Sequence, residues 1–347
     1  MITIADTLKR LYFVIFLIFL TTVKADSYDV NTSSGVSIGY LDNGVIYWDD
    51  IPYAKPPVGD LRWKAPRKLQ SDSIIESKDN NFCMQRTSSL GGSAQFSDKD
   101  ISGTEDCLYL DIISPSKKSN ELLPVMFWIH GGGNTSGLKD LYDFSKLVKK
   151  HNVIVIRINY RLGPFGWFTH PAIQDLQEGL DKTSNFGTLD IIAALKWVKE
   201  NISLFGGNSE NITIFGESAG GHNVLSLLVS NQAKGLFNKA ISMSGYTETI
   251  LPQDAYKPKN KSNTSSYSSW EVVNKIIKDQ SYKKEQNSFS NQEIRSILYS
   301  LDEEELYKIY SERESYEEIP LLTADGLIIP SIGLRKALGE KQYVNNV

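Results

Sequence analysis

A Gly-Glu-Ser-Ala-Gly pentapeptide at residues 216–220 constrains the fold of this chain more than any other feature. Residues 212–215 before it are apolar and β-branched, which is typical of a buried strand, and residues 221–229 after it have apolar side chains at helical spacing. A strand, a tight turn and a helix around Gly-x-Ser-x-Gly predict a nucleophile elbow, in which a strained turn exposes the Ser218 hydroxyl. The alternative, a glycine-rich strand–helix connection, gives Ser218 no role.

A second glycine-rich segment follows another predicted strand. The apolar run at residues 125–129 ends in the sequence HGGG at residues 130–133. Acyl transfer by a serine needs N–H donors for the oxyanion, and glycines leave their amide groups unshielded. The Ala219 amide, directly after the nucleophile and at a helix N-terminus, is predicted to be a further donor. A flexible turn is the alternative for the glycines, but the nearby elbow favours the oxyanion interpretation.

The rest of the pattern alternates strands with helices. Near-continuous apolar strands that alternate with helices predict an α/β fold, with a mostly parallel central sheet and helices on both faces. Two further features are a β-ribbon over residues 28–50 with its turn at residues 42–44, and a long loop over residues 160–186. Further strands are expected at 105–112, 153–159 and 239–244, helices at 141–150, 188–202, 270–278, 292–312 and 332–338, and a polar surface insert at 257–269.

The composition is that of a globular protein, with 41% hydrophobic and 22% charged residues among 347. A formal net charge of -4 gives no reason to expect nucleic acid or an anionic surface as a partner. Neither cysteine has a histidine at the sequence spacing typical of metal ligands, so no metal site is expected. No cofactor is implied either.

The N-terminus predicts a secretory signal peptide over residues 1–25. Lys9 and Arg10 precede an apolar run at residues 11–20, and Ala25 completes a short segment suited to cleavage. The run is too short to span a bilayer comfortably, although an uncleaved anchor is the alternative. In either case the mature chain is expected to be secreted, periplasmic or otherwise extracytoplasmic.

The two cysteines fit an oxidising compartment. Cys83 and Cys107 form an even pair in a chain expected to be exported, and such a pair is most simply a disulfide. The polar, Gly- and Ser-rich residues between them suit a loop closed in this way.

Together these motifs resemble the N-terminal portion of the type-B carboxylesterase (cholinesterase-like) family of α/β-hydrolases. The resemblance covers residues from about 28 to the end, with the motifs in family order. Besides GESAG and HGGG, the matching segments are IPYAKPPVGDLRW at 51–63, EDCLYL at 105–110, NYRLGPFGW at 159–167 and GTLDIIAALKWVKENI from residue 187.

The resemblance implies an α/β-hydrolase fold and hydrolysis of a small-molecule carboxylic ester through an acyl-enzyme on Ser218. It also implies that the amides of Gly132, Gly133 and Ala219 are the oxyanion donors. Three pairs of residues match structural features of the family: Cys83 with Cys107 as a disulfide, and Arg62 with Glu105 and Arg161 with Asp190 as ion pairs.

The catalytic base is where the sequence departs from the family. The family supplies a late histidine, oriented by an acid that is usually Glu, in the order Ser, acid, His. The four histidines of this sequence are His130 in the glycine segment, His151 in a helix–strand turn, His170 in the long loop, and His222. Only His222 follows the nucleophile, and four residues along the same helix it is expected one turn further from the site.

The family's acid would be expected a few residues beyond Val347. We therefore expect residues 28–347 to be a C-terminally incomplete domain, truncated before the last strands, as in a fragmentary record or gene model. A genuine short product is the alternative, and it would be nearly inactive with an unpaired sheet edge.

Two other functions remain open. A non-catalytic cholinesterase-like adhesion or binding domain would keep the fold, but the intact Ser218 counts against it. A lipase or peptidase on the same fold would differ in its acyl substrates.

The loop from Cys83 to Cys107 contains no tryptophan for a cation–π platform, which argues against choline esters as substrates. Phe165, Trp167 and Phe168 either line an apolar pocket or pack in the core.

Overall fold

The computed structural model describes residues 28–78, 81–117, 119–257, 268–282, 284–312 and 320–345. The predicted signal peptide and most of the polar insert expected at residues 257–269 lie outside these ranges. In the described ranges, no helix combines the length and the apolar character needed to cross a membrane.

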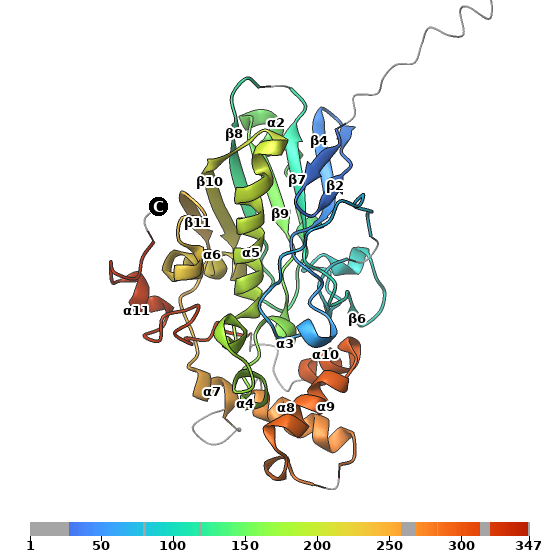
Figure 1. The fold of residues 1–347 in the computed structure, drawn as a ribbon, viewed down its shortest axis with the longest axis vertical. Helices are drawn as coiled ribbons and strands as arrows, with labels where there is room; N and C mark the ends of the chain where they lie inside the picture. The colour runs from blue at the N-terminus through green and yellow to red at the C-terminus, as the bar shows by residue number, and fades with distance from the viewer. Residues whose placement is uncertain are drawn as a thin grey trace, which may run out of the picture.

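A seven-stranded sheet forms the centre of the molecule, in the order β11-β10-β8-β9-β7-β4-β3 (Figure 1). Strands β9, β8, β10 and β11 are parallel neighbours, whereas β7, β4 and β3 are joined to the sheet by antiparallel pairs. The predicted α/β class is confirmed, and the sheet is mixed, with its parallel part confined to one half. The strands are β3 (Tyr40–Asp42), β4 (Val45–Pro52), β7 (Tyr109–Pro115), β8 (Leu123–Ile129), β9 (Ile154–Ile158), β10 (Gly207–Glu217) and β11 (Lys239–Met243).

The antiparallel half begins with a tight hairpin. Asn43 and Gly44 have φ values of 48° and 81°, and this left-handed pair forms the two-residue turn between β3 and β4. The turn predicted at residues 42–44 is therefore confirmed, but these strands belong to the central sheet rather than to a separate ribbon. Two small sheets lie apart from it, one of β1 (Val30–Thr32) with β2 (Gly35–Ser37), and one of β5 (Gln85–Arg86) with β6 (Ile101–Ser102).

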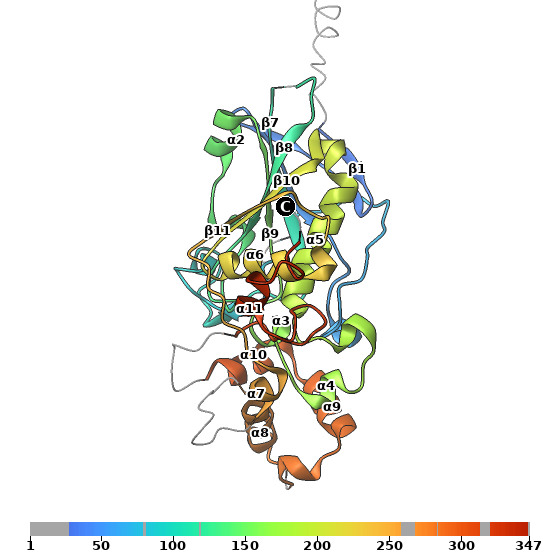
Figure 2. The ribbon, with the colours of Figure 1, turned by 90° about the vertical axis from the view of Figure 1, so that its left-hand side faces the viewer.

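Helices cover both faces of the sheet, as predicted. Helix α2 (Ser145–His151) lies on one face, and α5 (Phe186–Asn201) and α6 (Ala219–Val229) lie on the other (Figures 1 and 2). Side chains that point alternately to the two faces of the strands bury a core on each side. The core on the α2 side contains Val45, Ile113, Trp128, Val148, Val155 and Phe215, and the larger core on the α5 side includes Ile112, Phe127, Ile156, Leu195 and Val224.

A group of helices from the later part of the chain packs below the sheet in Figure 1. The single helix expected at residues 292–312 is two helices, because Leu301 is extended and Asp302 caps the second by accepting a hydrogen bond from the Glu305 amide. The loop expected at 160–186 contains two short helices. The helices of these regions are α3 (Gly163–Gly166), α4 (Pro171–Gln174), α7 (Pro252–Tyr256), α8 (Ser269–Asp279), α9 (Asn291–Ser300), α10 (Glu303–Ser311) and α11 (Leu334–Leu338), and short 3₁₀ helices are Gly59–Leu61, Ser93–Gln95, Lys139–Leu141, Gly179–Lys182, Ile202–Phe205, Asn231–Ala233 and Gln286–Ser288.

Two buried ion pairs join segments that are distant in the sequence. The Arg62 Nε atom lies 2.5 Å from the Glu105 Oε1 atom, and both side chains are almost fully buried. The Arg161 guanidinium donates two hydrogen bonds of 2.8 Å to the Asp190 carboxylate, which also accepts from the Arg161 amide at 3.0 Å. Both pairings agree with the expectation from the family resemblance.

The predicted disulfide is present. Cys83 and Cys107 are bonded, with their Cα atoms 4.9 Å apart, and they close the loop that contains β5 and β6. The bond anchors this loop just before the start of β7.

Candidate active site

Ser218 lies in the turn between β10 and α6 with φ 56° and ψ −119°. Its amide donates to the Met243 carbonyl at 2.9 Å, and its carbonyl accepts from the His222 amide at 2.9 Å. A positive φ at a non-glycine residue costs roughly 1–3 kcal/mol and persists only where the surroundings hold it. Here both hydrogen bonds hold it, and the Ser218 side chain remains partly exposed. The strained strand–turn–helix geometry expected from the sequence is thus present.

The flanking glycines allow close contact at this turn. A Cβ atom added to Gly216 would lie 2.6 Å from the Gly220 carbonyl group, and one added to Gly220 would collide with the Ile129 carbonyl oxygen. Only glycine therefore fits at either position without moving α6 away from the ends of β10 and β8.

The glycine segment lies against the elbow. A Cβ atom on Gly131 would lie 2.8 Å from the Glu217 carbonyl oxygen and 3.3 Å from Ser218 Cβ. The carboxyl ends of β8 and β10, which are parallel neighbours, bring the two motifs together at one edge of the sheet. We call residues 130–133 the oxyanion loop, after the role that the family resemblance implies for them.

The oxyanion loop turns back on itself after the strand. Gly132 and Gly133 have φ values of 97° and 62°, and the Gly132 carbonyl accepts from the amides of Thr135 and Ser136 at 3.1 and 3.0 Å. Among the described residues, none accepts a hydrogen bond from the amides of Gly132, Gly133 or Ala219. These N–H groups are therefore available to an anionic ligand beside the elbow.

The ring and the carbonyl of His130 are engaged by neighbouring residues. Its ring stacks on Tyr160 with centroids 4.3 Å apart, and the Tyr160 hydroxyl donates to the His130 carbonyl at 2.7 Å. Its Nδ1 atom lies 2.8 Å from the Gly131 carbonyl oxygen, which can only accept, so Nδ1 carries the proton. Burial lowers the pKa of His130 to about 4, so the ring is neutral at physiological pH.

His222 is buried in α6 and makes no hydrogen bond to the Ser218 hydroxyl. Its ring contacts Tyr246 with centroids 4.1 Å apart, and neither ring nitrogen has a hydrogen-bond partner among the described residues. Burial lowers the pKa of His222 to about 4. His222 therefore lies one helical turn beyond Ser218, as expected, and its ring is not hydrogen-bonded to the Ser218 hydroxyl.

The other two histidines lie on different elements. His151 is exposed at the end of α2. His170 caps α4, where its Nδ1 atom accepts from the Ala172 amide at 3.0 Å, and burial lowers its pKa to about 4. Thus none of the four histidine side chains hydrogen-bonds to Ser218 among the described residues.

Sequence reasoning missed two asparagines that connect the motifs. Asn134, directly after the oxyanion loop, has φ 57°, and its carbonyl accepts from the Gly163 amide at 2.7 Å. The Asn223 side-chain amide donates to the Asn134 side-chain oxygen at 3.0 Å, and both residues are fully buried. An asparagine next to three glycines is a signal for a left-handed residue, but nothing local indicated its partner.

The aromatic residues of the long loop pack in the core. Phe165, Trp167 and Phe168 are each no more than 5% exposed. Phe168 stacks on Trp63 with centroids 5.5 Å apart. The core alternative is therefore the one that the structure favours for these three side chains.

Within the described ranges, no cluster of three or more His, Cys, Asp or Glu side chains is arranged to hold a metal ion.

Comparisons with known proteins agree with this geometry. Residues 27–332 match the model of the carboxylesterase family. The chain is 45% identical over 230 residues to the para-nitrobenzyl esterase of Bacillus subtilis (strain 168), a match that covers 65% of this chain and 45% of that protein. It is 33% identical to carboxylesterase 1D of Rattus norvegicus, over 96% of this chain and 60% of the relative.

This chain is also similar to a solved structure of a thermophilic PNB esterase, with a TM-score of 0.71 and 33% identity. The match covers 90% of this chain and 60% of the esterase chain. The chain thus spans less than two thirds of the length of these relatives. The matched motifs, the α/β-hydrolase fold and the extent of the family match together establish that this chain belongs to the carboxylesterase family.

Proposed function

We propose that Ser218 is the nucleophile of a serine carboxylic-ester hydrolase, with the amides of Gly132, Gly133 and Ala219 as the oxyanion donors. One observation carries the proposal: a serine held at positive φ lies beside a glycine loop whose amides have no acceptor among the described residues. The names of the relatives, which are esterases, support the same reaction class. The substrate class is a small-molecule carboxylic ester, and the chemistry needs no cofactor.

In the proposed reaction the Ser218 Oγ atom attacks the ester carbonyl carbon, and the carbonyl oxygen becomes the oxyanion held by the three amides. Collapse of this intermediate breaks the bond to the alcohol, which leaves with the serine proton. Water then attacks the acyl-enzyme, releases the carboxylic acid and restores the hydroxyl.

The proton must pass through a base, and we infer that this base is none of the four histidines of the sequence. The side chains of His130 and His222 are buried and neutral, and neither ring hydrogen-bonds to the Ser218 hydroxyl. We propose that residues 28–347 are an incomplete α/β-hydrolase domain, and that the acid and the histidine of the triad lie outside this sequence. The matches cover only 45% of the Bacillus subtilis esterase and 60% of the rat carboxylesterase, which supports this proposal.

Acyl-enzyme trapping tests the nucleophile. The 347-residue chain is incubated with p-nitrophenyl acetate, digested and analysed by mass spectrometry. We expect acetylation of Ser218, loss of that adduct in Ser218→Ala, and no loss in Ser226→Ala, which removes a serine of the helix that follows Ser218. Acetylation of surface lysines alone would favour a non-catalytic binding domain, the alternative function.

Adding a C-terminal segment that supplies the acid and the histidine tests whether the base lies outside this sequence. A chimaera joins this chain to the C-terminal part of the Bacillus subtilis esterase. We expect its hydrolysis of p-nitrophenyl acetate to exceed that of the chain by at least about 10²-fold, the usual contribution of a positioned general base, and to require Ser218. A folded chimaera with no gain would contradict the proposal.

We also propose that residues 1–25 direct export, so that the mature protein is secreted or otherwise extracytoplasmic. The bonded pair of Cys83 and Cys107 supports an oxidising compartment. N-terminal sequencing of the mature protein tests this, with an N-terminus near Asp26 as the expected result and an intact Met1 as the contradicting one.

A further inference from the structure

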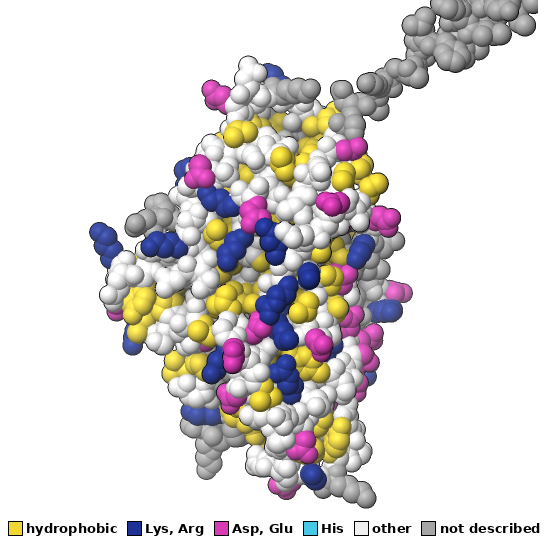
Figure 3. Space-filling model, in the orientation of Figure 1, with side chains coloured by type: hydrophobic (Ala, Val, Ile, Leu, Met, Phe, Trp, Pro, Cys, Tyr) yellow, Lys and Arg dark blue, Asp and Glu magenta, His cyan; other side chains and the backbone are white. Residues whose placement is uncertain are grey.

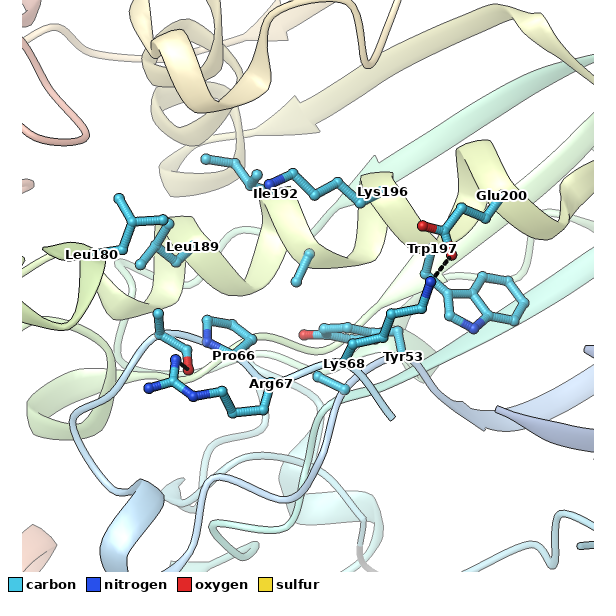
Figure 4. Close-up of a pocket in the computed structure, with 13 residues that line it drawn as sticks. Tyr53, Pro66, Arg67, Lys68, Leu180, Leu189, Ile192, Lys196, Trp197 and Glu200 are labelled. Carbon is cyan, nitrogen blue, oxygen red and sulfur yellow. Dashed lines mark hydrogen bonds and ion pairs between the residues drawn. The ribbon is translucent and has the colours of Figure 1, made fainter. Parts of the chain in front are cut away.

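A groove separate from the proposed catalytic site runs along α5 (Figure 4). One wall is the outer stripe of α5, where residues three or four positions apart share one face. The other wall is formed by residues 53–54 and 65–68. Its volume of about 170 Å³ is similar to that of a protein cavity that holds one benzene molecule. The apolar lining consists mainly of Tyr53, Ala65, Leu189, Ile192, Ala193 and Trp197.

The floor of this groove presents carbon atoms. The Tyr53 hydroxyl donates to the Asn159 carbonyl at 2.7 Å, and the Trp197 Nε1 atom donates to the Ser34 hydroxyl at 2.8 Å. The polar atoms of both aromatic side chains are therefore engaged elsewhere. A polar ligand group on this floor would lose its hydrogen bonds to water and gain none from these side chains. The part of a ligand that enters must therefore be apolar.

The rim of the groove is charged and has an excess of cations. Arg67 pairs with Asp181 at 2.5 Å and Lys68 pairs with Glu200 at 2.7 Å. Lys196 is exposed on α5 and has no ion-pair or hydrogen-bond partner among the described residues. Figure 4 shows its side chain running back along the helix, and Figure 3 shows basic side chains gathered over this face of the molecule.

We propose that the groove binds a small amphipathic carboxylate, with one aromatic ring or a short alkyl chain on the floor and the carboxylate paired with Lys196. The size of the groove sets the apolar part, and the unpaired ammonium on the rim selects the sign of the head group. An amine of the same shape meets repulsion, and an alcohol gains only the apolar contact. This site is independent of the proposed esterase function, because neither Ser218 nor the oxyanion loop lines it.

Titration of the 347-residue chain with three ligands of one shape tests the head group. Phenylbutyrate, phenylbutanol and phenylbutylamine are compared by isothermal titration calorimetry. We expect phenylbutyrate to bind most tightly and phenylbutylamine least, and we expect added salt to weaken only the phenylbutyrate complex. Equal affinities for the three ligands would overturn the proposal.

Two variants and one control test whether the ligands bind in this groove. Lys196→Glu changes an exposed helix position, so it should leave the fold intact while weakening phenylbutyrate binding about fivefold or more. Lys234→Glu reverses the charge of an exposed lysine on another element and should change nothing. Ala193→Trp fills the groove and should abolish binding of all three ligands.

Either of two results from these variants overturns the proposal. One is phenylbutyrate affinity that is unchanged in both Lys196→Glu and Ala193→Trp. The other is an oligomer of the parent chain that Ala193→Trp dissociates, measured by size-exclusion chromatography, with no phenylbutyrate binding. That second result would identify another copy of the chain as the occupant of the groove.

Discussion

The Asn223 side-chain amide donates a buried hydrogen bond of 3.0 Å to the Asn134 side-chain oxygen. Asn223 lies one turn into α6 after Ser218, and Asn134 directly follows Gly133. The bond therefore joins the helix of the nucleophile elbow to the end of the oxyanion loop. One polar contact helps to hold the two halves of the proposed active site in register.

Asn223→Ala should loosen this connection. The Asn134 oxygen would be buried without a donor, which costs about 1–3 kcal/mol in the free energy of unfolding. Acetylation of Ser218 should also slow, because the oxyanion loop would lose its tie to α6. Urea unfolding and adduct formation measure the two effects. Asn231→Ala, at an exposed position after α6, serves as the control, and equal stability of the two variants would contradict the prediction.

Arg161→Met should be strongly destabilising. Asp190 is fully buried, and removal of its bidentate partner leaves a buried carboxylate without a counter-charge. The expected loss is about 3–5 kcal/mol in the free energy of unfolding. By contrast, Lys68→Met removes an exposed pair with Glu200 and should cost no more than about 1 kcal/mol. Similar losses in denaturant unfolding for the two variants would refute this difference.

His170 should make the fold acid-sensitive. Burial lowers its folded-state pKa to about 4, below its unfolded value of about 6.5, so the unfolded chain binds the proton first as pH falls. Stability is unaffected above the unfolded pKa and falls between about pH 6.5 and about pH 4, by on the order of 2–3 kcal/mol at about pH 4.5.

His170→Asn keeps an acceptor for the Ala172 amide but cannot titrate. Relative to the parent chain, this variant should therefore gain stability as the pH is lowered. Urea unfolding at neutral and acid pH measures the difference, and His151→Asn, at the exposed end of α2, controls for the loss of an imidazole. A constant gap between parent and His170→Asn across pH would rule out the predicted linkage.

The β11 edge should promote self-association of the 347-residue chain. Within the described ranges β11 pairs only with β10, and its Ile241 and Met243 side chains are 44% and 38% exposed. An open strand with exposed apolar side chains is a template for further pairing. Ile241→Lys should raise the monomer fraction in analytical ultracentrifugation, whereas the same change at Leu204, an exposed residue outside the sheet, should not.

Features that depend on residues close together in the sequence could be predicted from it. The elbow at Ser218 and the turn at Asn43 and Gly44 were predictable because each depends on φ values that only a few neighbouring residues allow. The disulfide followed from the pair of cysteines in a chain expected to be exported. The ion pair of Arg161 with Asp190 was predictable only through the family resemblance.

Features that depend on contacts between residues distant in the sequence could not be predicted from it. The antiparallel pairing of β7 with β9 is set by strand order, which periodicity does not report. The break at Leu301 was hidden because the apolar spacing continues across it, although Asp302 is a good helix cap. The contact of Asn134 with Asn223 joins residues 89 positions apart, so neither residue signals the other.

The pH dependence of Ser218 acetylation tests the central claim most directly, which is that the chain holds a nucleophile and oxyanion donors without a histidine base. Acetylation by p-nitrophenyl acetate is followed by mass spectrometry from about pH 5 to about pH 9, in the parent chain and in His222→Gln. We predict a rate that rises steadily with pH, requires Ser218 and is the same in both proteins. A rate that His222→Gln lowers strongly, with a profile in the parent chain that is flat or sigmoidal instead of rising steadily with pH, would show that His222 is the base and contradict the claim.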